Sequence, residues 1–178
     1  MGSLSNRSPR TKSKSSSDRR QAVISLMLLA LCPAALGQKI PLAVGQQFQP
    51  PALTLLDGTP VDWQRLRGNI LLLEFWASWC PFCARQNPLL DRFYREHQSR
   101  GLEVITISLD KTKDAALGYM KKGGYAFKAG MATEDWTAIY RQRQGLPQVF
   151  VIDRLGKIAA IEVREMMEED IRELARFL

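Results

Sequence analysis

Histidine and cysteine are both scarce in this sequence. Its 178 residues include one histidine, His97, and three cysteines, of which Cys80 and Cys83 are separated by only two residues. A structural zinc site needs four nitrogen or sulfur ligands, which often come as two separated pairs. Since the chain has only one close pair, the composition argues against a zinc site, and no metal or organic cofactor is predicted.

Most of the chain also lacks an excess of either charge. The formal net charge is +7, and the excess comes from six basic residues near the start: Arg7, Arg10, Lys12, Lys14, Arg19 and Arg20. From Gln38 onward, 19 of the 25 basic residues are balanced by 17 of the 18 acidic ones. A nucleic-acid-binding domain carries a basic patch on its folded part, so nucleic acid is not predicted as a partner.

The first 37 residues have the organisation of a secretory signal. Residues 1–21 are rich in Ser, Lys and Arg and contain no apolar run, whereas residues 22–36 are almost wholly apolar. The small residues Ala35 and Gly37 end this segment, as is typical of a signal with a cleavage site. We therefore expect either cleavage near Gly37 or an uncleaved anchor that tethers the protein to a membrane through residues 22–36.

Export predicts a periplasmic or otherwise extracytoplasmic protein, in a compartment where disulfides persist. After cleavage, Cys80 and Cys83 are the only cysteines that remain. Residues 38–45 are expected to form a linker. Residues 46–178 are long enough for one domain with a substantial core.

The exported part alternates between apolar runs and amphipathic segments. The runs predicted to be strands are 70–77, 102–109, 127–132, 148–152 and 157–163. The segments predicted to be helices are 81–100, 113–122, 134–142 and 168–178. Strand–helix–strand alternation implies parallel pairing, and the tight turn before residue 157 adds an antiparallel edge. The predicted class is α/β, with a central mixed sheet flanked by helices and an N-terminal β-hairpin over residues 53–63.

The spacing of the two cysteines distinguishes a redox pair from a structural disulfide. A disulfide stabilises a protein mainly by closing a loop of the unfolded chain, and the effect grows with loop length. A loop with two intervening residues gains little, so a structural role is disfavoured. The pair is therefore predicted to be a reversible dithiol that exchanges disulfides with other molecules.

Cys80 is predicted to be the attacking residue of this pair. It lies where a buried strand meets the start of a helix, and Pro81 suits the first helical position. Unpaired backbone N–H groups and the helix dipole favour a thiolate there, which should lower the pKa of Cys80. Cys83 lies one turn deeper and should stay protonated longer. The expected arrangement is one exposed nucleophile and one shielded resolving thiol.

Two further residues carry functional hypotheses. Glu74 is the only charged residue between Arg67 and Arg85, and it falls inside the strand predicted to be buried. A buried carboxylate is costly unless it is protonated or paired. Either Glu74 lies at an edge and reaches water, or it is a buried acid with a raised pKa that takes the proton of Cys83. Pro147 precedes an apolar strand, and its peptide bond can be cis or trans.

These segments resemble the thioredoxin-fold family. The stretch LLLEFWASWCPFCARQNP is similar to the family's active-site segment, and GLPQVFVIDRLGKI is similar to its cis-proline strand and following hairpin. With the exported context, the closest resemblance is to the thiol–disulfide oxidoreductases of the TlpA/ResA type. The resemblance covers roughly residues 46–178 and implies a thioredoxin-like fold.

The resemblance also implies roles for individual residues. It implies Cys80 as the nucleophile and Cys83 as the resolving thiol, with Glu74 as the buried acid and Pro147 as the cis-proline beside the pair. The residues implied to contact the substrate are Trp79, Pro81, Phe82 and Leu146. The implied partners are protein substrates with disulfides or thiols, and a membrane thiol carrier that supplies electrons.

Three features depart from the family's pattern. Proline precedes Phe82 in the dipeptide, whereas reductants of this type more often have proline second. Gln86 replaces a glutamate that tunes the cysteines in several relatives, and Leu146 replaces a frequent threonine. We expect a reductant of client disulfides, for example of haem-binding cysteines in cytochrome c maturation or of copper-site thiols. A disulfide-forming oxidase, a peroxiredoxin-like peroxidase and a non-enzymatic peptide-binding module remain alternatives.

Overall fold

A computed structural model of the protein describes residues 41–178 and, before them, only Gly2. Gly2 apart, the predicted signal or anchor of residues 1–37 and the start of the predicted linker lie outside the described residues. Residues 41–178 belong to one compact unit. None of the helices in this part of the chain is both long enough and apolar enough to cross a membrane.

Strands and helices alternate along the described chain. The strands are β1 (Ile70–Trp76), β2 (Leu102–Ser108), β3 (Lys128–Met131), β4 (Gln148–Ile152) and β5 (Ile158–Glu162). The α-helices are α1 (Pro81–His97), α2 (Lys113–Gly123), α3 (Glu134–Tyr140) and α4 (Glu168–Glu173). Two short 3₁₀ helices, η1 (Gln98–Arg100) and η2 (Leu174–Phe177), extend α1 and α4. The strands and helices predicted from residue 70 onward are therefore all present.

The strands form one mixed sheet in the order β3-β2-β1-β4-β5. The crossovers from β1 to β2 and from β2 to β3 give parallel pairs, as the strand–helix–strand alternation predicts. The last hairpin adds the antiparallel pairs β1–β4 and β4–β5. The central strand β1 is buried along its whole length, which explains why its sequence is a continuous apolar run.

The predicted N-terminal hairpin is present as a short antiparallel turn rather than as two full strands. The Leu55 N–H donates to the Thr59 oxygen over 2.8 Å, and the Val61 N–H donates to the Leu53 oxygen over 2.9 Å. Thr54 and Pro60 form a single antiparallel bridge, and Leu55 also bridges to Gly130 on the edge strand β3. Pro60 has no backbone N–H with which to extend a ladder. Gly130 allows the close approach, because a Cβ there would lie 2.7 Å from the backbone oxygen of Thr54. The turn thus also covers the edge of β3.

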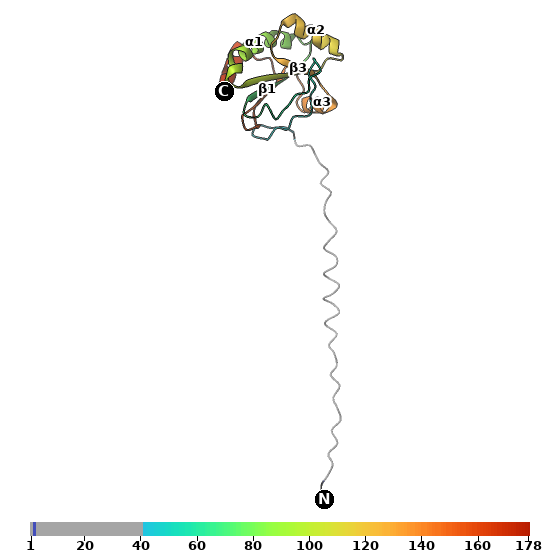
Figure 1. Cartoon of the computed structure of the whole chain (residues 1–178), viewed down its shortest axis with the longest axis vertical. Coiled ribbons are helices and arrows are strands. Elements are labelled where there is room, and N and C mark those ends of the chain that lie inside the picture. The colour runs from blue at the N-terminus through green and yellow to red at the C-terminus, as the bar shows by residue number, and fades with distance from the viewer. Residues whose placement is uncertain (1, 3–40) are drawn as a thin grey trace. The chain divides into compact units, whose positions relative to one another are not determined.

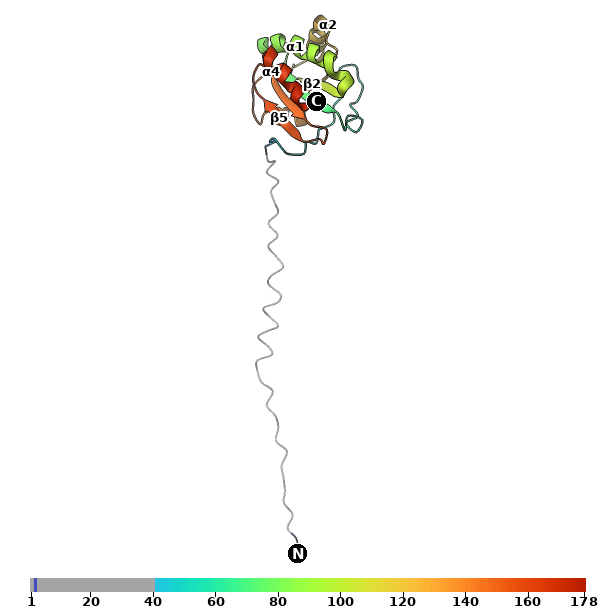
Figure 2. The same ribbon diagram turned by 90° about the vertical axis from the view of Figure 1, so that its left-hand side faces the viewer.

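Helices α1, α2 and α4 cover one face of the sheet, whereas α3 and the N-terminal segment cover the other. On the first face, which we call the α1 face, Leu72 packs against Leu90 of α1 and Ile171 of α4. On the second, the α3 face, Phe75 packs against Trp136 of α3. Figure 1 shows α1 and α2 on one side of the sheet and α3 on the other, and Figure 2 shows α4 beside α1.

Candidate active site

The two cysteines lie at the N-terminal end of α1. Cys80 is the N-cap residue, with an extended backbone, and its Sγ accepts a hydrogen bond from the backbone N–H of Cys83 over 3.3 Å. Pro81 occupies the start of the helix, where its missing N–H leaves no hydrogen bond unmade. Both cysteines are free thiols. The Cys80 sulfur therefore lies on one of the backbone donors that a helix start leaves unpaired.

The expectation that the nucleophilic sulfur is exposed is wrong. Cys80 is 3% exposed and Cys83 is fully buried, because both pack in an apolar cluster with Trp76. The exposed side chains beside them are Trp79, at 68%, and Phe82, at 49%. These two aromatic side chains are among the residues that the family resemblance implied to contact the substrate.

Glu74 lies in the central strand β1, four residues along from its start at Ile70. Its side chain is fully buried, so the alternative of an edge position open to water is wrong. Burial raises the pKa of Glu74 from its ordinary value of 4.5 to about 8, and a hydrogen bond from Gln86 acts in the opposite direction. The carboxyl group can therefore gain or lose a proton near neutral pH.

Two amide side chains of α1 hold the Glu74 carboxyl group. Gln86 Nε2 donates to Glu74 Oε1 over 2.8 Å. With its amide nitrogen turned toward the acid, Asn87 donates to Glu74 Oε1 and Oε2, over 2.9 and 3.1 Å, and to the backbone oxygen of Cys83 over 3.1 Å. The Asn87 oxygen then accepts a hydrogen bond from the Tyr119 hydroxyl over 3.2 Å. These contacts connect the acid to the helical turn that carries Cys83.

Sequence reasoning missed Asn87 and the contact between Gln86 and Glu74. Both amides are fully buried. They follow Cys83 by three and four residues, which is the spacing that puts side chains on one face of a helix. Polar residues at such positions in a helix that covers a sheet are the signal that could have found them.

Cys83 is held in its protonated form. Burial raises the pKa of the Cys83 thiol well above its usual range, and the hydrogen bond to Cys80 and the negative charge of Glu74 act in the same direction. The thiol therefore needs a base before it can act as a nucleophile. This agrees with the prediction that Cys83 stays protonated.

The peptide bond between Leu146 and Pro147 is cis, as the family resemblance implied. Pro147 directly precedes β4, whose Gln148 lies opposite Phe75 of β1. Leu146 packs against the cluster that contains Cys80 and Cys83. The fold thus brings the predicted cis-proline segment to the same end of the sheet as the cysteines.

A buried aspartate fixes the loop that carries Trp79. Asp110 follows β2 and accepts hydrogen bonds from the backbone N–H of Ser78, over 3.2 and 3.1 Å, and from its hydroxyl over 2.8 Å. The Ser108 hydroxyl donates to the same carboxylate over 2.8 Å. Sequence reasoning missed Asp110, although an acid directly after a buried strand is a visible signal.

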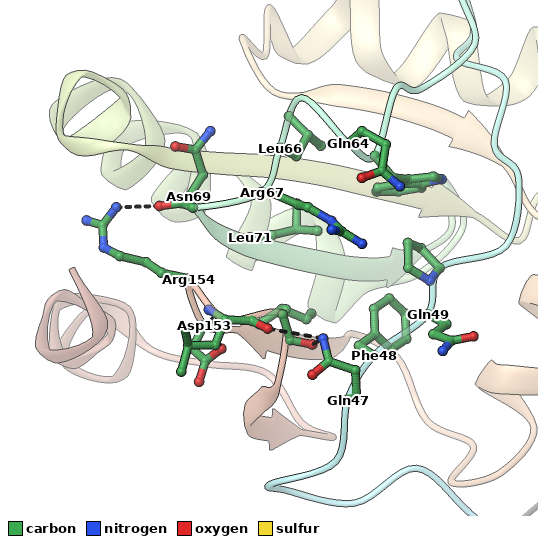
Figure 3. A pocket seen from close by; sticks show the side chains of 16 residues that line it. Gln47, Phe48, Gln49, Gln64, Leu66, Arg67, Asn69, Leu71, Asp153 and Arg154 are labelled. Carbon is green, nitrogen blue, oxygen red and sulfur yellow. Dashed lines mark hydrogen bonds between the residues drawn. The ribbon is translucent and has the colours of Figure 1, made fainter.

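A cavity lies at the end of the sheet opposite the cysteines, where β1 begins and β4 ends. This cavity of about 520 Å³ is lined by Phe48, Trp63 and Arg67, among others. Figure 3 shows Arg67 extending across it, while Arg154 turns toward the backbone oxygen of Gly68. None of the predicted site residues lines it. Since β1 rises by about 3.3 Å per residue over its length, the cavity is separate from the cysteines.

Comparisons with known proteins agree with this geometry. Residues 35–178 match the family model described as Redoxin. The chain is 26% identical over 156 residues to a thiol-disulfide oxidoreductase ResA of Bacillus cereus, an alignment that covers 82% of this chain and 89% of that protein.

Two solved structures are also similar. A putative protein disulfide isomerase from Bacteroides thetaiotaomicron has a TM-score of 0.68 and 28% identity, over 77% of this chain and 91% of that one. A putative thiol:disulfide interchange protein DsbE from Chlorobium tepidum has a TM-score of 0.68 and 25% identity, over 76% of this chain and 94% of that one.

Since the family model spans most of its length, the chain belongs to the Redoxin family. Its mixed five-stranded sheet flanked by helices is the thioredoxin-like fold. Within that fold it is of the TlpA/ResA type, and its activity is that of a thiol–disulfide oxidoreductase.

Proposed function

We propose that the protein reduces disulfides of protein clients outside the cytoplasm, with Cys80 as nucleophile and Cys83 as resolving thiol. One observation carries the assignment of roles. The Cys80 sulfur accepts a backbone hydrogen bond at the start of α1, whereas the Cys83 thiol is buried beside Glu74 and has a raised pKa. Disulfide exchange requires this difference between an attacking and a resolving thiol.

In the first half-reaction, the Cys80 thiolate attacks one sulfur of the client disulfide. The client S–S bond breaks, a mixed disulfide forms between Cys80 and the client, and the other client sulfur leaves as a thiolate and takes a proton from water. The exposed Trp79 and Phe82, together with Pro81, Leu146 and Pro147, bind the client chain around the reacting sulfur.

In the second half-reaction, the carboxylate of Glu74 takes the proton of Cys83. The resulting thiolate attacks the Cys80 sulfur, the mixed disulfide breaks, and a Cys80–Cys83 disulfide forms. The second client sulfur leaves and is protonated, so two electrons have passed from the dithiol to the client. A membrane thiol carrier then reduces the enzyme by the reverse exchange. No metal or organic cofactor takes part in this scheme.

The chain organisation in this proposal follows the sequence. Residues 1–37 act as a signal or an anchor, residues 38–45 as a linker, and residues 46–178 as the catalytic domain. Export would place the dithiol where client disulfides form. The clients we propose are haem-binding cysteines in cytochrome c maturation or the thiols of copper sites.

An equilibrium titration of the Cys80–Cys83 couple against glutathione tests the direction of electron flow. A potential near the thioredoxin value of about −270 mV supports a reductant. A potential near about −120 mV would instead support the disulfide-forming oxidase, which the proline-first dipeptide Pro81-Phe82 favours. A pair that fails to cycle between dithiol and disulfide would overturn the proposed reaction.

Cys80→Ser and Cys83→Ala test the two roles. Cys80→Ser should abolish reduction of a disulfide-containing client, because the attacking sulfur is gone. Cys83→Ala should accumulate the mixed disulfide between Cys80 and the client, which mass spectrometry detects. Full activity of Cys80→Ser in cells would point to a peptide-binding module, and trapping of the client on Cys83 would reverse the roles.

A further inference from the structure

Gln86 makes two buried hydrogen bonds that lead away from the cysteines. Its Nε2 donates to Glu74 Oε1 over 2.8 Å, and its Oε1 accepts from the backbone N–H of Met166 over 2.7 Å. Gln86 is fully buried and Met166 is 1% exposed. The amide thus links the acid in β1 to the loop between β5 and α4, which we call the 163–167 loop.

These two neighbours fix the orientation of the amide. A backbone N–H can only donate, so the Gln86 oxygen must face Met166, and the nitrogen is left to face Glu74. The adjacent residue of α1, Arg85, forms a two-fold ion pair with Glu165 over 2.7 and 2.6 Å. Consecutive residues of α1 therefore hold consecutive residues of the 163–167 loop, one pair at the surface and one in the interior.

We propose that Gln86 is a positioning residue that, anchored by the 163–167 loop, keeps the Glu74 carboxyl group as a hydrogen-bond acceptor ready to take the Cys83 proton. The inference rests on the proposed function, in which Glu74 is the base for Cys83. A donor fixed on the carboxylate favours its charged form. The hydrogen bond from Gln86 accordingly lowers the pKa of Glu74, whereas burial raises it.

Few other groups near Glu74 can shift its pKa. Its neighbours across the sheet are Thr106 of β2 and Val149 of β4, neither of which titrates near neutral pH. From the helices, the titratable groups are Cys83 and Tyr119, and burial raises the pKa of both. Among the described residues, no charged side chain contributes to the pKa of Glu74, and the hydrogen bond from Gln86 is the contact that lowers it.

Ellman's reagent separates the two thiol steps. With one equivalent of this aromatic disulfide, attack by Cys80 releases the first coloured thiolate and attack by Cys83 releases the second. Stopped-flow absorbance measures both rates on the reduced protein between pH 6 and 9.5. If Glu74 is the base, the second rate in the unmodified protein should rise with a midpoint near pH 8, the pKa of this acid.

Gln86→Leu should move that midpoint upward by about one pH unit, so that the second rate near pH 7 falls roughly tenfold. The first rate should stay within about two-fold, since Gln86 does not contact Cys80. Gln86→Glu keeps an acceptor for Met166 and serves if Gln86→Leu does not fold. Its carboxyl group must share a proton with Glu74, which should again move the midpoint upward.

Gln148→Leu is the matched control. Gln148 is the other glutamine that is fully buried in the described chain, and it lies opposite Phe75, on the α3 face rather than beside Glu74. Its replacement should leave the midpoint unchanged. An equal shift in Gln148→Leu and Gln86→Leu would overturn the proposal, because any loss of packing would then explain both.

Glu74→Gln distinguishes failure of this inference from failure of the proposed function. If Glu74→Gln leaves the pH profile of the second rate unchanged, Glu74 is not the base, and both proposals for this acid fail. If Glu74→Gln changes the profile but neither Gln86 variant shifts it, only the positioning role of Gln86 is overturned. If both hold, Gln86→Leu should add no further shift in the Glu74→Gln background.

Discussion

Near the end of β1, the neighbouring residues Phe75 and Glu74 bury side chains of opposite character on its two faces. Toward α3, Phe75 packs among aromatic rings, with ring centroids 6.1 Å from Trp136 and 6.2 Å from Phe150. Toward α1, the neighbouring residue Glu74 is an acid held by amides. Apolar burial stabilises the fold, whereas a buried ionised acid costs free energy. The same strand therefore buries a stabilising aromatic ring on one face and, on the other, an acid whose burial costs stability.

The largest expected effect is the pH dependence that Glu74 gives to stability. The folded protein keeps the proton of Glu74 up to about pH 8, whereas the unfolded chain loses it near the ordinary pKa of 4.5. Between these values the folded state binds more protons, so raising the pH lowers the free energy of unfolding. The loss should be complete by about pH 8 and amount to roughly 5 kcal/mol, at about 1.4 kcal/mol per pKa unit.

Urea unfolding of the reduced protein between pH 4.5 and 9 measures this loss. Glu74→Gln carries no titrating group there, so its free energy of unfolding should decline less across the range and exceed that of the unmodified protein at pH 9. If the two proteins gave parallel curves, the assignment of a raised pKa to this acid would be wrong.

The next effect belongs to the α3 face. Trp136 is fully buried, and its indole N–H donates to the backbone oxygen of Ala52 over 3.1 Å. Trp136→Ala should lower the free energy of unfolding by about 4 kcal/mol, as truncation of a buried aromatic side chain usually does. Urea unfolding near pH 6 checks this value, and Trp136→Phe provides a milder change if the alanine variant does not fold.

The comparison of faces also predicts what this substitution leaves unchanged. Since Trp136 lies on the face away from Glu74, folded Trp136→Phe should keep both thiol exchange rates, and the pH midpoint of the second, close to those of the unmodified protein. A shifted midpoint would show that the aromatic face also sets the chemistry, and the division between the two faces would fail.

The sequence predicted this division only in part. The continuous apolar run of 70–77 predicted that β1 is buried on both sides, but the position of Glu74 within it left open whether the acid is buried or reaches water at an edge. The partners of Glu74 were not predictable in this way, because Asn87 and Gln86 become its neighbours only when α1 crosses the sheet. A local pattern records the period of a helix but not the strand residue that it will face.

The burial of Cys80 shows the same limit. Its place at a strand–helix junction was readable from the apolar run and Pro81. The side chains from distant segments that pack in the same cluster were not, since Ala129 belongs to β3 and Leu146 precedes β4. The segment 53–63 is a similar case, because its local turn was predictable but the bridge from Leu55 to the distant Gly130 was not.

Replacing each of the two buried glutamines should change the free energy of unfolding by a smaller amount, and in opposite directions. Gln86 satisfies both ends of its amide, so Gln86→Leu should lower the free energy of unfolding by about 1–3 kcal/mol. Neither polar atom of the Gln148 amide has a hydrogen-bond partner among the described residues. Gln148→Leu should therefore be neutral or stabilise the fold by about 1 kcal/mol. Urea unfolding at pH 6 measures both, and equal losses would show that Gln148 is satisfied as well.

The smallest expected effect concerns the exposed ion pair between α1 and the 163–167 loop. Arg85 and Glu165 form an ion pair at 2.6 Å, and their side chains are 57% and 17% exposed. The hydrogen bond from Arg85 lowers the pKa of Glu165, and the positive charge of Arg85 acts in the same direction. Exposed ion pairs contribute little to stability, and salt screens them.

Glu165→Gln should therefore lower the urea midpoint only slightly in low salt, and the difference should shrink in about 1 M NaCl as the Debye length falls to about 3 Å. A large loss that persists in high salt would mean that the 163–167 loop depends on this pair, and that Gln86 is not its main anchor.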